Sequence, residues 1–170
     1  GSALVSGLSA SGATVHNLDI HDSANPEATF HKTDLTSENS VKDSLSTIEK
    51  IDALIVCAGI QLVGLDSKIG EVSLETWQKT VDINMTGAFL SVKHAIPGLI
   101  KSGRGSVILI GSPTAMSMEG AGYTAYGASK AGMMGLSRII AADYKDKGIR
   151  SNVVVPGSML TPLIEKILQD

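Results

Sequence analysis

The sequence predicts an α/β fold in which a parallel β-sheet is covered by helices on both faces. Short apolar runs alternate with segments of helical periodicity along the chain, which is typical of strand–helix–strand crossover units. Two of the runs, at 51–58 and 106–110, are almost entirely apolar, as expected for strands buried on both faces of a parallel sheet. Ligands of such sheets bind at the carboxyl ends of the strands, so we expect functional residues just after each strand.

The first part of the chain is expected to contain three strands and one helix. Residues Ala13–Asp19 follow a glycine and end in an acid, which favours a strand, and Ala28–Thr33 is a shorter and more mixed strand. The segment Thr36–Lys50 places three aliphatic side chains at helical spacing, so it predicts an amphipathic helix. The apolar segment Ile51–Ala58 stops at a glycine and predicts the third strand.

The second part alternates helix and strand twice. Ser73–Lys101 is expected to be helical, with an interruption near Pro97-Gly98. Ser106–Ile110 predicts a buried strand, and Ala125–Lys147 a long helix that contains many small residues. Ile149–Val155 predicts a further strand that ends at a Pro-Gly pair.

Composition excludes several classes of function. The chain has 170 residues with 43% hydrophobic and 18% charged residues, which is ordinary for a globular domain with a sizeable core. We find no internal repeat or linker, so residues 1–170 are expected to form one domain. The net charge of −3 provides no basic surface for nucleic acid. The four histidines show no metal-ligand spacing, so no metal site is expected.

Cysteine usage and hydropathy favour the cytoplasm as the default compartment. Cys57 is the only cysteine, which excludes an internal disulfide and fits a reducing environment. No apolar run approaches the roughly 18 residues of a membrane span. The first residues lack the charged-then-apolar layout of a signal peptide. We therefore expect no membrane partner.

Tyr126 and Lys130 form the first chemical motif. Four residues apart on a helix, the two side chains share one face. A free phenol has a pKa of about 10, and a nearby ammonium stabilises the phenolate and lowers that pKa. Such a phenol suits the proton transfer that accompanies carbonyl reduction or alcohol oxidation. Taken alone, the spacing also fits an ordinary solvated helix face.

Ser112 and Asn84 add to this motif. Ser112 lies two residues past the strand 106–110, where its hydroxyl can hydrogen-bond a substrate oxygen and stabilise developing charge. A serine in a turn with Pro113 is the simpler explanation. Asn84 lies inside the helical segment 73–101, although asparagine is a mediocre helix former. By itself it would be expected to face solvent.

These segments together resemble the short-chain dehydrogenase/reductase family. Gly111–Pro113 followed by the Tyr126–Gly132 segment resembles the family's active-site region, with a Ser-to-Tyr separation of 14 residues (126 minus 112), one longer than the family pattern. Asp82–Gly87 resembles its Asn-bearing helix motif, and Asn152–Thr161 its Pro-Gly-x-x-x-Thr segment. The resemblance implies a Rossmann-like, doubly wound parallel sheet in three αβα layers. It also implies an NAD(P)-dependent oxidoreductase acting on a secondary alcohol or ketone.

The resemblance assigns catalytic roles to four residues. Tyr126 would be the general acid/base, and Lys130 would lower its pKa and bind the nicotinamide ribose. Ser112 would orient the substrate carbonyl, and Asn84 would hold a water molecule in a proton relay. The substrate pocket would be lined by Ser112, Met118 and Tyr126.

Asp19 decides the expected cofactor. An acid at the end of this strand takes the ribose hydroxyls in dinucleotide-binding folds, and it repels the 2′-phosphate of NADP. NAD is therefore favoured, while His21 and Lys32 leave NADP open. The cofactor-binding residues implied by the resemblance are Gly1, Asp19, Ile20, Asp34, Leu35, Cys57, Ala58, Gly59, Tyr126, Lys130, Pro156, Gly157, Met159 and Thr161.

The chain departs from the family pattern in two respects. Val56-Cys57 replaces the two asparagines of the Asn-Asn-Ala-Gly motif, and we expect Cys57 to be a small buried apolar residue. The first strand, most of the glycine-rich phosphate loop and the last strand are not found; Gly1 would be the last loop glycine, or part of an expression scar. In a sheet of order 3-2-1-4-5-6, two strand edges would stay unpaired. We therefore expect part of a longer or partly ordered protein, with poor cofactor binding by these residues alone.

Two other functions stay open. A non-catalytic cofactor-binding relative is disfavoured because it would need none of Ser112, Tyr126 and Lys130. A sugar-nucleotide epimerase or dehydratase shares the Tyr-x-x-x-Lys pair but fits the Pro156-Gly157 segment less well. The resemblance further implies a homodimer or homotetramer that associates through the helices 73–101 and 125–147. The substrate is not identified.

Overall fold

Helices and strands alternate along the chain as the sequence predicts. The structure, a computed structural model, describes residues 1–22, 25–117 and 121–157. In order, its elements are α1 (Ser2–Ala10), β1 (Val15–Asp19), β2 (Ala28–Lys32), α2 (Glu38–Ser46), β3 (Ala53–Val56), α3 (Leu74–Val81), a π-helical turn (Asp82–Thr86), α4 (Gly87–Ser102), β4 (Ser106–Ile110), a 3₁₀ turn (Pro113–Ala115), α5 (Thr124–Tyr144), a second 3₁₀ turn (Lys145–Lys147) and β5 (Arg150–Val154). Helix α1 is the element that the sequence reading did not delimit.

All strand pairs are parallel, but they form two sheets. β1 pairs with β2, in register from Val15↔Ala28 to Asp19↔Lys32. A second sheet has the order β3-β4-β5. In the described part of the chain β1 and β3 therefore each pair on one side only, so the expectation of two unpaired edges is confirmed.

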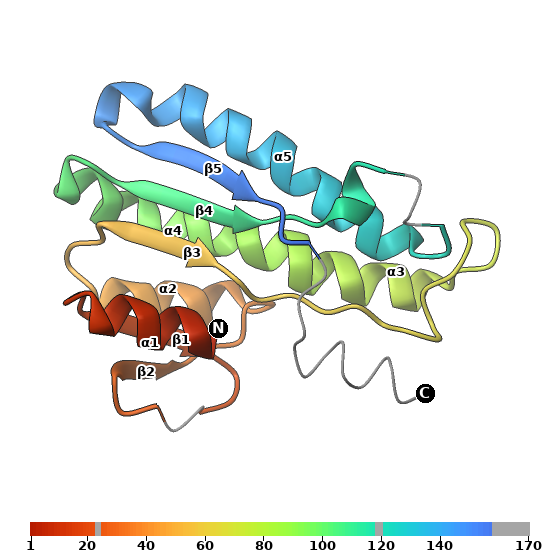
Figure 1. Ribbon diagram of the computed structural model, residues 1–170, viewed down its shortest axis with the longest axis horizontal. Coiled ribbons are helices and arrows are strands. Elements are labelled where there is room, and N and C mark those ends of the chain that lie inside the picture. The colour runs from red at the N-terminus through yellow and green to blue at the C-terminus, as the bar shows by residue number, and fades with distance from the viewer. Residues whose placement is uncertain (23–24, 118–120, 158–170) are drawn as a thin grey trace.

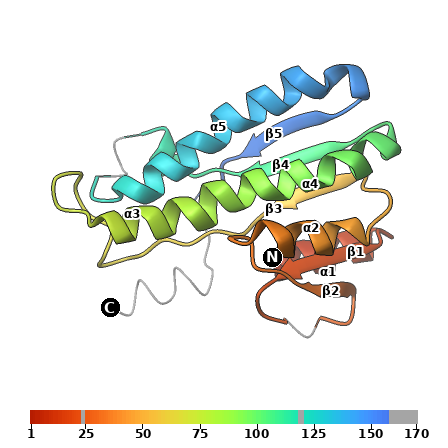
Figure 2. The same cartoon turned by 180° about the vertical axis from the view of Figure 1, so that it is seen from behind.

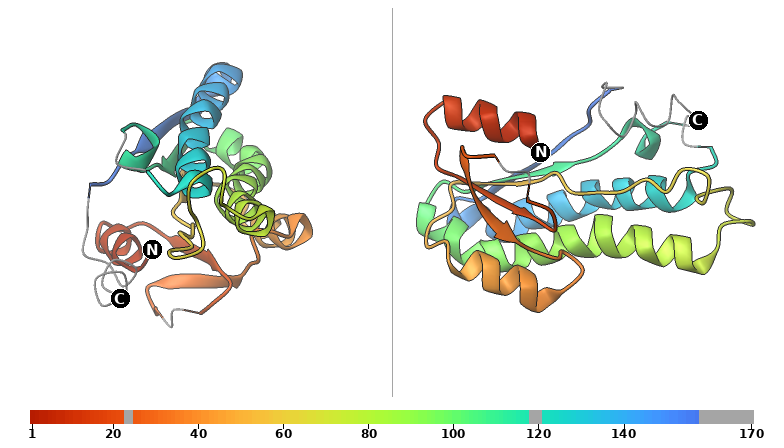
Figure 3. Two further views of the ribbon diagram at one scale, coloured as in Figure 1. Left: turned by 90° about the vertical axis from the view of Figure 1, so that its right-hand side faces the viewer. Right: turned by 90° about the horizontal axis from the view of Figure 1, so that it is seen from below.

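The helices form layers on both sides of the strands. α1 lies on one side, and α2, α4 and α5 lie on the other (Figures 1 and 2). The end-on view shows the strands of β1 and β2 between α1 and α2 (Figure 3). This is the predicted three-layer αβα arrangement, and it places the loops that follow the strands at one end of the molecule.

Serine side chains fix the starts of two helices. The Ser37 hydroxyl accepts a hydrogen bond from the Ser40 N–H, and the Ser73 hydroxyl from the Thr76 N–H. Each satisfies a backbone donor that the first helical turn leaves free. α2 consequently begins after Ser37, and it ends at Ser46, short of the predicted boundary at residue 50.

The prediction of a break near Pro97 is wrong. α4 continues through Pro97, which is exposed, so water can reach the carbonyl group that loses its helical partner. Gly98 instead allows α4 to pack closely against Ile51, because a Cβ at this position would lie 2.8 Å from the Ile51 Cγ1 atom. The interruption is the π-helical turn at Asp82–Thr86, a rare irregularity that is frequent at functional sites.

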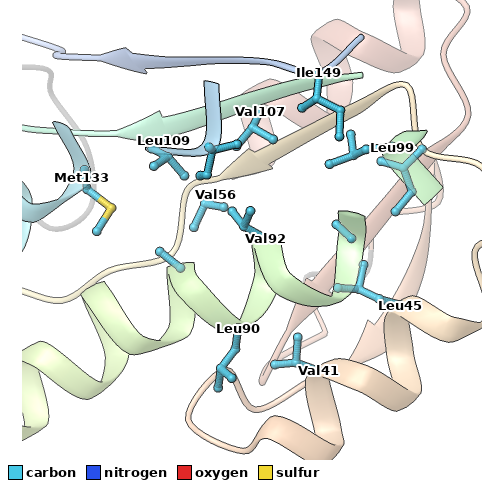
Figure 4. Packing of buried hydrophobic residues seen from close by; sticks show 14 residues of the cluster. Val41, Leu45, Val56, Leu90, Val92, Leu99, Val107, Leu109, Met133 and Ile149 are labelled. Carbon is cyan, nitrogen blue, oxygen red and sulfur yellow. The ribbon is translucent and has the colours of Figure 1, made fainter. Parts of the chain in front are cut away.

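The core lies between the three-stranded sheet and the helices of one face. Figure 4 shows Val107 and Leu109 of β4 on the side of the sheet that faces α4. Val41 and Leu45 of α2 extend the same cluster. β3 is less buried than predicted: of its four residues only Val56 is buried, because β3 is an edge strand in the described residues. No helix among the described residues is long and apolar enough to cross a bilayer.

Candidate active site

The predicted site residues gather at the carboxyl ends of the strands. Asp19 and Ile20 end and follow β1, and Asp34 and Leu35 follow β2. Ser112 comes two residues after β4. The arrowheads of β3, β4 and β5 point the same way, so the segments that follow them meet at one end (Figure 1). The remaining residues of this edge are Cys57, Ala58 and Gly59 after β3, and Pro156 and Gly157 after β5.

Lys130 is buried, not solvated. Its side chain reaches across to β4, where Nζ donates a 2.9 Å hydrogen bond to the Ile110 carbonyl oxygen, and the residue is only 6% exposed. Nζ lies 5.8 Å from the centroid of the Tyr126 ring, one helical turn away. Burial lowers the pKa of Lys130 from its usual value, and the neighbouring Cys57 opposes that shift. The solvated-face explanation of this pair is therefore excluded.

Asn84 is also buried, at 2% exposure, in the π-helical turn. Its Oδ1 accepts a 2.7 Å hydrogen bond from the Ile60 N–H, while Nδ2 donates to the Ile60 carbonyl oxygen at 2.9 Å and to the Ser129 Oγ at 3.0 Å. The Ser129 hydroxyl in turn donates to the Tyr126 carbonyl oxygen. The asparagine thus joins the loop after β3 to the first turn of α5.

Gly59 packs closely against two of these polar groups. A Cβ at Gly59 would lie 3.2 Å from both the Asn84 Oδ1 and the Lys130 Nζ atoms, closer than most real side-chain contacts. Any side chain at this position would press on the two polar groups. The absence of a side chain at Gly59 therefore lets the loop after β3 lie close to both an amide oxygen and an ammonium group.

Ser112 is held at the start of the 3₁₀ turn. The residue is 8% exposed, and its Oγ accepts a 2.9 Å hydrogen bond from the Thr114 hydroxyl and a longer one, 3.4 Å, from the Thr114 N–H. The turn contacts α5: a Cβ on Gly127 would lie 3.6 Å from the Thr114 carbonyl oxygen. Ser112 is thereby fixed next to the helix that carries Tyr126.

Asp66 is a site residue that the sequence reading missed. It lies in the loop between β3 and α3 and is 6% exposed. Its Oδ1 accepts a hydrogen bond from the Ala125 N–H at 3.1 Å, and its Oδ2 one from the Tyr126 N–H at 2.9 Å. The carboxylate thus caps α5 at Tyr126, where the helix dipole favours negative charge. No sequence signal marks it, because its partners are 59 and 60 residues away.

The cofactor side of the edge is open. The Asp19 carboxylate is exposed, with Oδ1 accepting a hydrogen bond from the His21 N–H at 3.0 Å. Asp34 is exposed as well, and hydrogen bonds from the Thr36 hydroxyl and N–H lower its pKa. Ala58 and Gly59 present exposed backbone, and Pro156 is half-buried. These groups fit a nicotinamide dinucleotide: a carboxylate for a ribose, and open backbone for a close approach.

The prediction that Cys57 is buried is wrong, because it is exposed just beyond the edge strand β3. Gly1 is exposed and precedes the first turn of α1, where backbone N–H groups lack helical partners. The described residues contain no cluster of three or more metal-ligating side chains. Met118, Met159 and Thr161 lie outside the described residues.

Comparison with known proteins identifies the family. The short chain dehydrogenase family model matches residues 1–170. The chain is 33% identical to a 2,5-dichloro-2,5-cyclohexadiene-1,4-diol dehydrogenase of Sphingobium indicum, covering all of this chain and 72% of that protein. The chain therefore belongs to the short-chain dehydrogenase family, and the prediction of a nicotinamide-dependent enzyme of this family is confirmed.

Solved structures agree with this assignment. The ligand-free aldohexose dehydrogenase of Thermoplasma acidophilum superposes with a TM-score of 0.91 at 32% identity, over 99% of this chain and 66% of that one. The NADH-dependent reductase A1-R′ in complex with NAD gives a TM-score of 0.80 at 27% identity, over 92% and 73%. The chain thus spans about two thirds to three quarters of these relatives.

Proposed function

We propose that the protein transfers a hydride between NAD(H) and a secondary alcohol or ketone, with Tyr126 as the general acid/base. The burial of Lys130 beside Tyr126 is the observation that carries this proposal. Burial of a lysine ammonium group costs free energy of folding, as its lowered pKa shows. Its position against the tyrosine ring therefore indicates a role other than solubility.

Each polar residue has a part in the proposed reaction. When bound, the nicotinamide ring supplies or accepts the hydride. Tyr126 accepts the hydroxyl proton of the alcohol during oxidation and returns a proton to the carbonyl oxygen during reduction. Lys130 stabilises the phenolate electrostatically, and the Ser112 hydroxyl donates a hydrogen bond to the substrate oxygen.

Most of the hydrogen-bonding groups of the Asn84 side chain are already engaged within the chain. Both hydrogens of its amide and one lone pair of Oδ1 are engaged by Ile60 and Ser129. The second lone pair of Oδ1 is not used by these bonds, and the Asn84 Oδ1 and Lys130 Nζ atoms both lie close to Gly59. We propose that these two groups bind the water of a proton relay.

NAD is the proposed cofactor because of Asp19. Its exposed carboxylate at the end of β1 suits two ribose hydroxyls and opposes a 2′-phosphate. Similar solved structures hold NAD in one case, the A1-R′ reductase, and NADPH in another, a variant of ElxO, so the choice of NAD depends on Asp19. The names of the other two relatives, which act on a cyclic diol and on aldohexoses, support a hydroxylated ring as the substrate.

We also propose that the protein self-associates through α4 and α5. Phe89 of α4 is 47% exposed and Ile139 of α5 is 60% exposed, so each of the two helices offers a large apolar side chain to a partner. Gly135 of α5 has no atom near the position of a Cβ, so another helix can approach closely there. Light scattering of the full-length protein should give a dimer or tetramer mass, and a monomer at micromolar concentration would contradict this proposal.

The test is a fluorescence titration of the full-length protein with NADH and NADPH, with Asp19→Ala as the variant. We expect tighter binding of NADH than of NADPH, and a reduced preference in the variant because the repulsive carboxylate is gone. Turnover is then measured with 1,4-cyclohexanediol and D-glucose as alcohol probes and NAD⁺ as oxidant. Tyr126→Phe should still bind NADH and should turn over neither probe.

The outcomes separate the candidate functions. Binding without turnover of any secondary alcohol would favour the non-catalytic alternative. Absence of binding of either nucleotide would overturn the proposal and would direct attention to the altered Val56-Cys57 segment.

A further inference from the structure

The Ser112 hydroxyl can act on a substrate oxygen only as a donor. A serine hydroxyl has one hydrogen and two lone pairs, and it rotates to suit its neighbours. A carbonyl oxygen that gains negative charge needs the hydrogen. Whatever fixes the lone pairs of Ser112 therefore decides whether this hydrogen is available to the substrate.

Thr114 occupies the acceptor side of Ser112. The Thr114 hydroxyl donates to the Ser112 Oγ at 2.9 Å, and the Thr114 N–H approaches the same atom at 3.4 Å. Both interactions use lone pairs of Ser112 and leave its hydrogen free. Among the described residues no acceptor takes that hydrogen, although Ser112 is almost fully buried.

The local backbone keeps Thr114 in this place. Ser112 begins the 3₁₀ turn, Pro113 fixes the first turn residue, and the Ala115 N–H donates to the Ser112 carbonyl oxygen at 3.0 Å. The turn also packs against Gly127, next to Tyr126. The threonine hydroxyl is therefore held over Ser112 by backbone geometry and does not depend on a bound ligand.

We propose that Thr114 is a positioning residue that makes the Ser112 hydroxyl an obligate hydrogen-bond donor to the substrate oxygen. The inference rests on the proposed function. No proton is transferred between the two hydroxyls: each keeps its own hydrogen, and the proton of the reaction moves between Tyr126 and the substrate. Loss of the Thr114 hydroxyl frees Ser112 to rotate, so it weakens stabilisation of the charged oxygen without disturbing the cofactor.

The experiment is a double-mutant cycle on the full-length protein. Thr114→Val removes the hydroxyl and keeps the shape, Thr114→Ser restores it, and Ser112→Ala removes the group on which it acts. Steady-state oxidation of 1,4-cyclohexanediol and of D-glucose by NAD⁺ gives kcat and KM, and thermal melting checks the fold of each variant.

We expect Thr114→Val to lower kcat about three- to ten-fold, the factor typical of one hydrogen bond, with KM for NAD⁺ unchanged. Thr114→Ser should restore kcat to within about two-fold. In the Ser112→Ala background Thr114→Val should cause no further loss.

Two results would overturn the inference alone: an unchanged kcat in Thr114→Val, or the same loss in the Ser112→Ala background as in the wild type. A wild-type protein that binds NADH but oxidises no secondary alcohol would overturn the proposed function together with this inference.

Discussion

Polar side chains are buried and hydrogen-bonded in one part of the protein and exposed in another. The buried polar cluster, made of Asp66, Asn84, Ser112, Ser129 and Lys130, lies between β4, α5 and the loop after β3, and each member hydrogen-bonds within the chain. The N-terminal sheet, made of β1 and β2, has no fully buried residue, and the Asp19 side chain at its end is exposed.

This difference shows which groups of the candidate site are held in place without a bound ligand. Buried polar groups are stable only when they are hydrogen-bonded, so the groups proposed for proton transfer are positioned before any ligand arrives. The carboxylates proposed for nucleotide binding, Asp19 and Asp34, are exposed and each keeps its Oδ2 atom for a ligand. Changes in the buried polar cluster should therefore cost activity or stability, whereas changes in the N-terminal sheet at positions other than Asp19 should cost little of either.

The largest effect is expected for Lys130→Met. Removal of the ammonium should lower kcat by about 10²–10⁴-fold, the range of acid–base assistance. The free energy of unfolding at neutral pH should stay within about 1 kcal/mol of the wild-type value or rise, because a buried charge is removed together with one hydrogen bond. Kinetics and denaturant unfolding measure the two, with the exposed Lys101→Met as control.

The pH dependence of the free energy of unfolding provides a second test of Lys130. Because burial lowers the pKa of Lys130 in the folded protein, the unfolded chain holds its proton to higher pH. Between the folded-state pKa and the usual 10.5, the free energy of unfolding of the wild type therefore gains a contribution that rises with pH. Lys130→Met should lack it. Equal pH slopes in the two proteins would mean that Lys130 is not buried as described.

The next largest effect is expected for Asn84→Ala. This change leaves the N–H and carbonyl groups of Ile60 without their side-chain partner, so unfolding should become easier by about 2–4 kcal/mol. Urea denaturation measures it, and Asn39→Ala at an exposed position of α2 is the matched control. A loss of unfolding free energy no larger than in the control would contradict the difference between the buried polar cluster and the N-terminal sheet.

A smaller effect is expected for Asp66→Ala. Loss of a helix cap typically costs about 1 kcal/mol, and here the first turn of α5 carries Tyr126, so kcat should fall as well. Asp66→Asn keeps one acceptor and should lie between the variant and the wild type. The exposed Asp43→Ala is the control, and identical melts and rates for all three variants would contradict the capping role.

The smallest effect is expected in the N-terminal sheet, at His16 and His31. The His16 Nδ1 and His31 Nε2 atoms are 2.9 Å apart, and burial, followed by His16, lowers the pKa of His31 below 6.5. The unfolded chain then binds the His31 proton more readily, so the free energy of unfolding declines as pH falls through and below 6.5. His16→Ala should make that decline slightly shallower in urea titrations, whereas His21→Ala should leave it unchanged.

The sequence predicted local features well and long-range ones poorly. The strand Ser106–Ile110 has the predicted bounds, because an apolar run between glycines allows little else. The break near Pro97 was wrong because an exposed proline is tolerated where water reaches the freed carbonyl, and Cys57 was misjudged because its burial depends on which strands adjoin β3. No sequence pattern predicted the role of Asp66, because its hydrogen-bond partners belong to a distant element.

By itself, the sequence determined the class of fold and the order of the elements after α1, and it marked Ser112, Tyr126 and Lys130 as the candidate catalytic residues, because apolar periodicity and short motif spacings are local properties of the chain. Only the tertiary structure decided that Lys130 and Asn84 are buried, that Asp66 caps α5 and that Thr114 donates to Ser112. Burial and hydrogen-bond partners depend on which distant segments pack together, and packing sets the solvation of every charged or polar group.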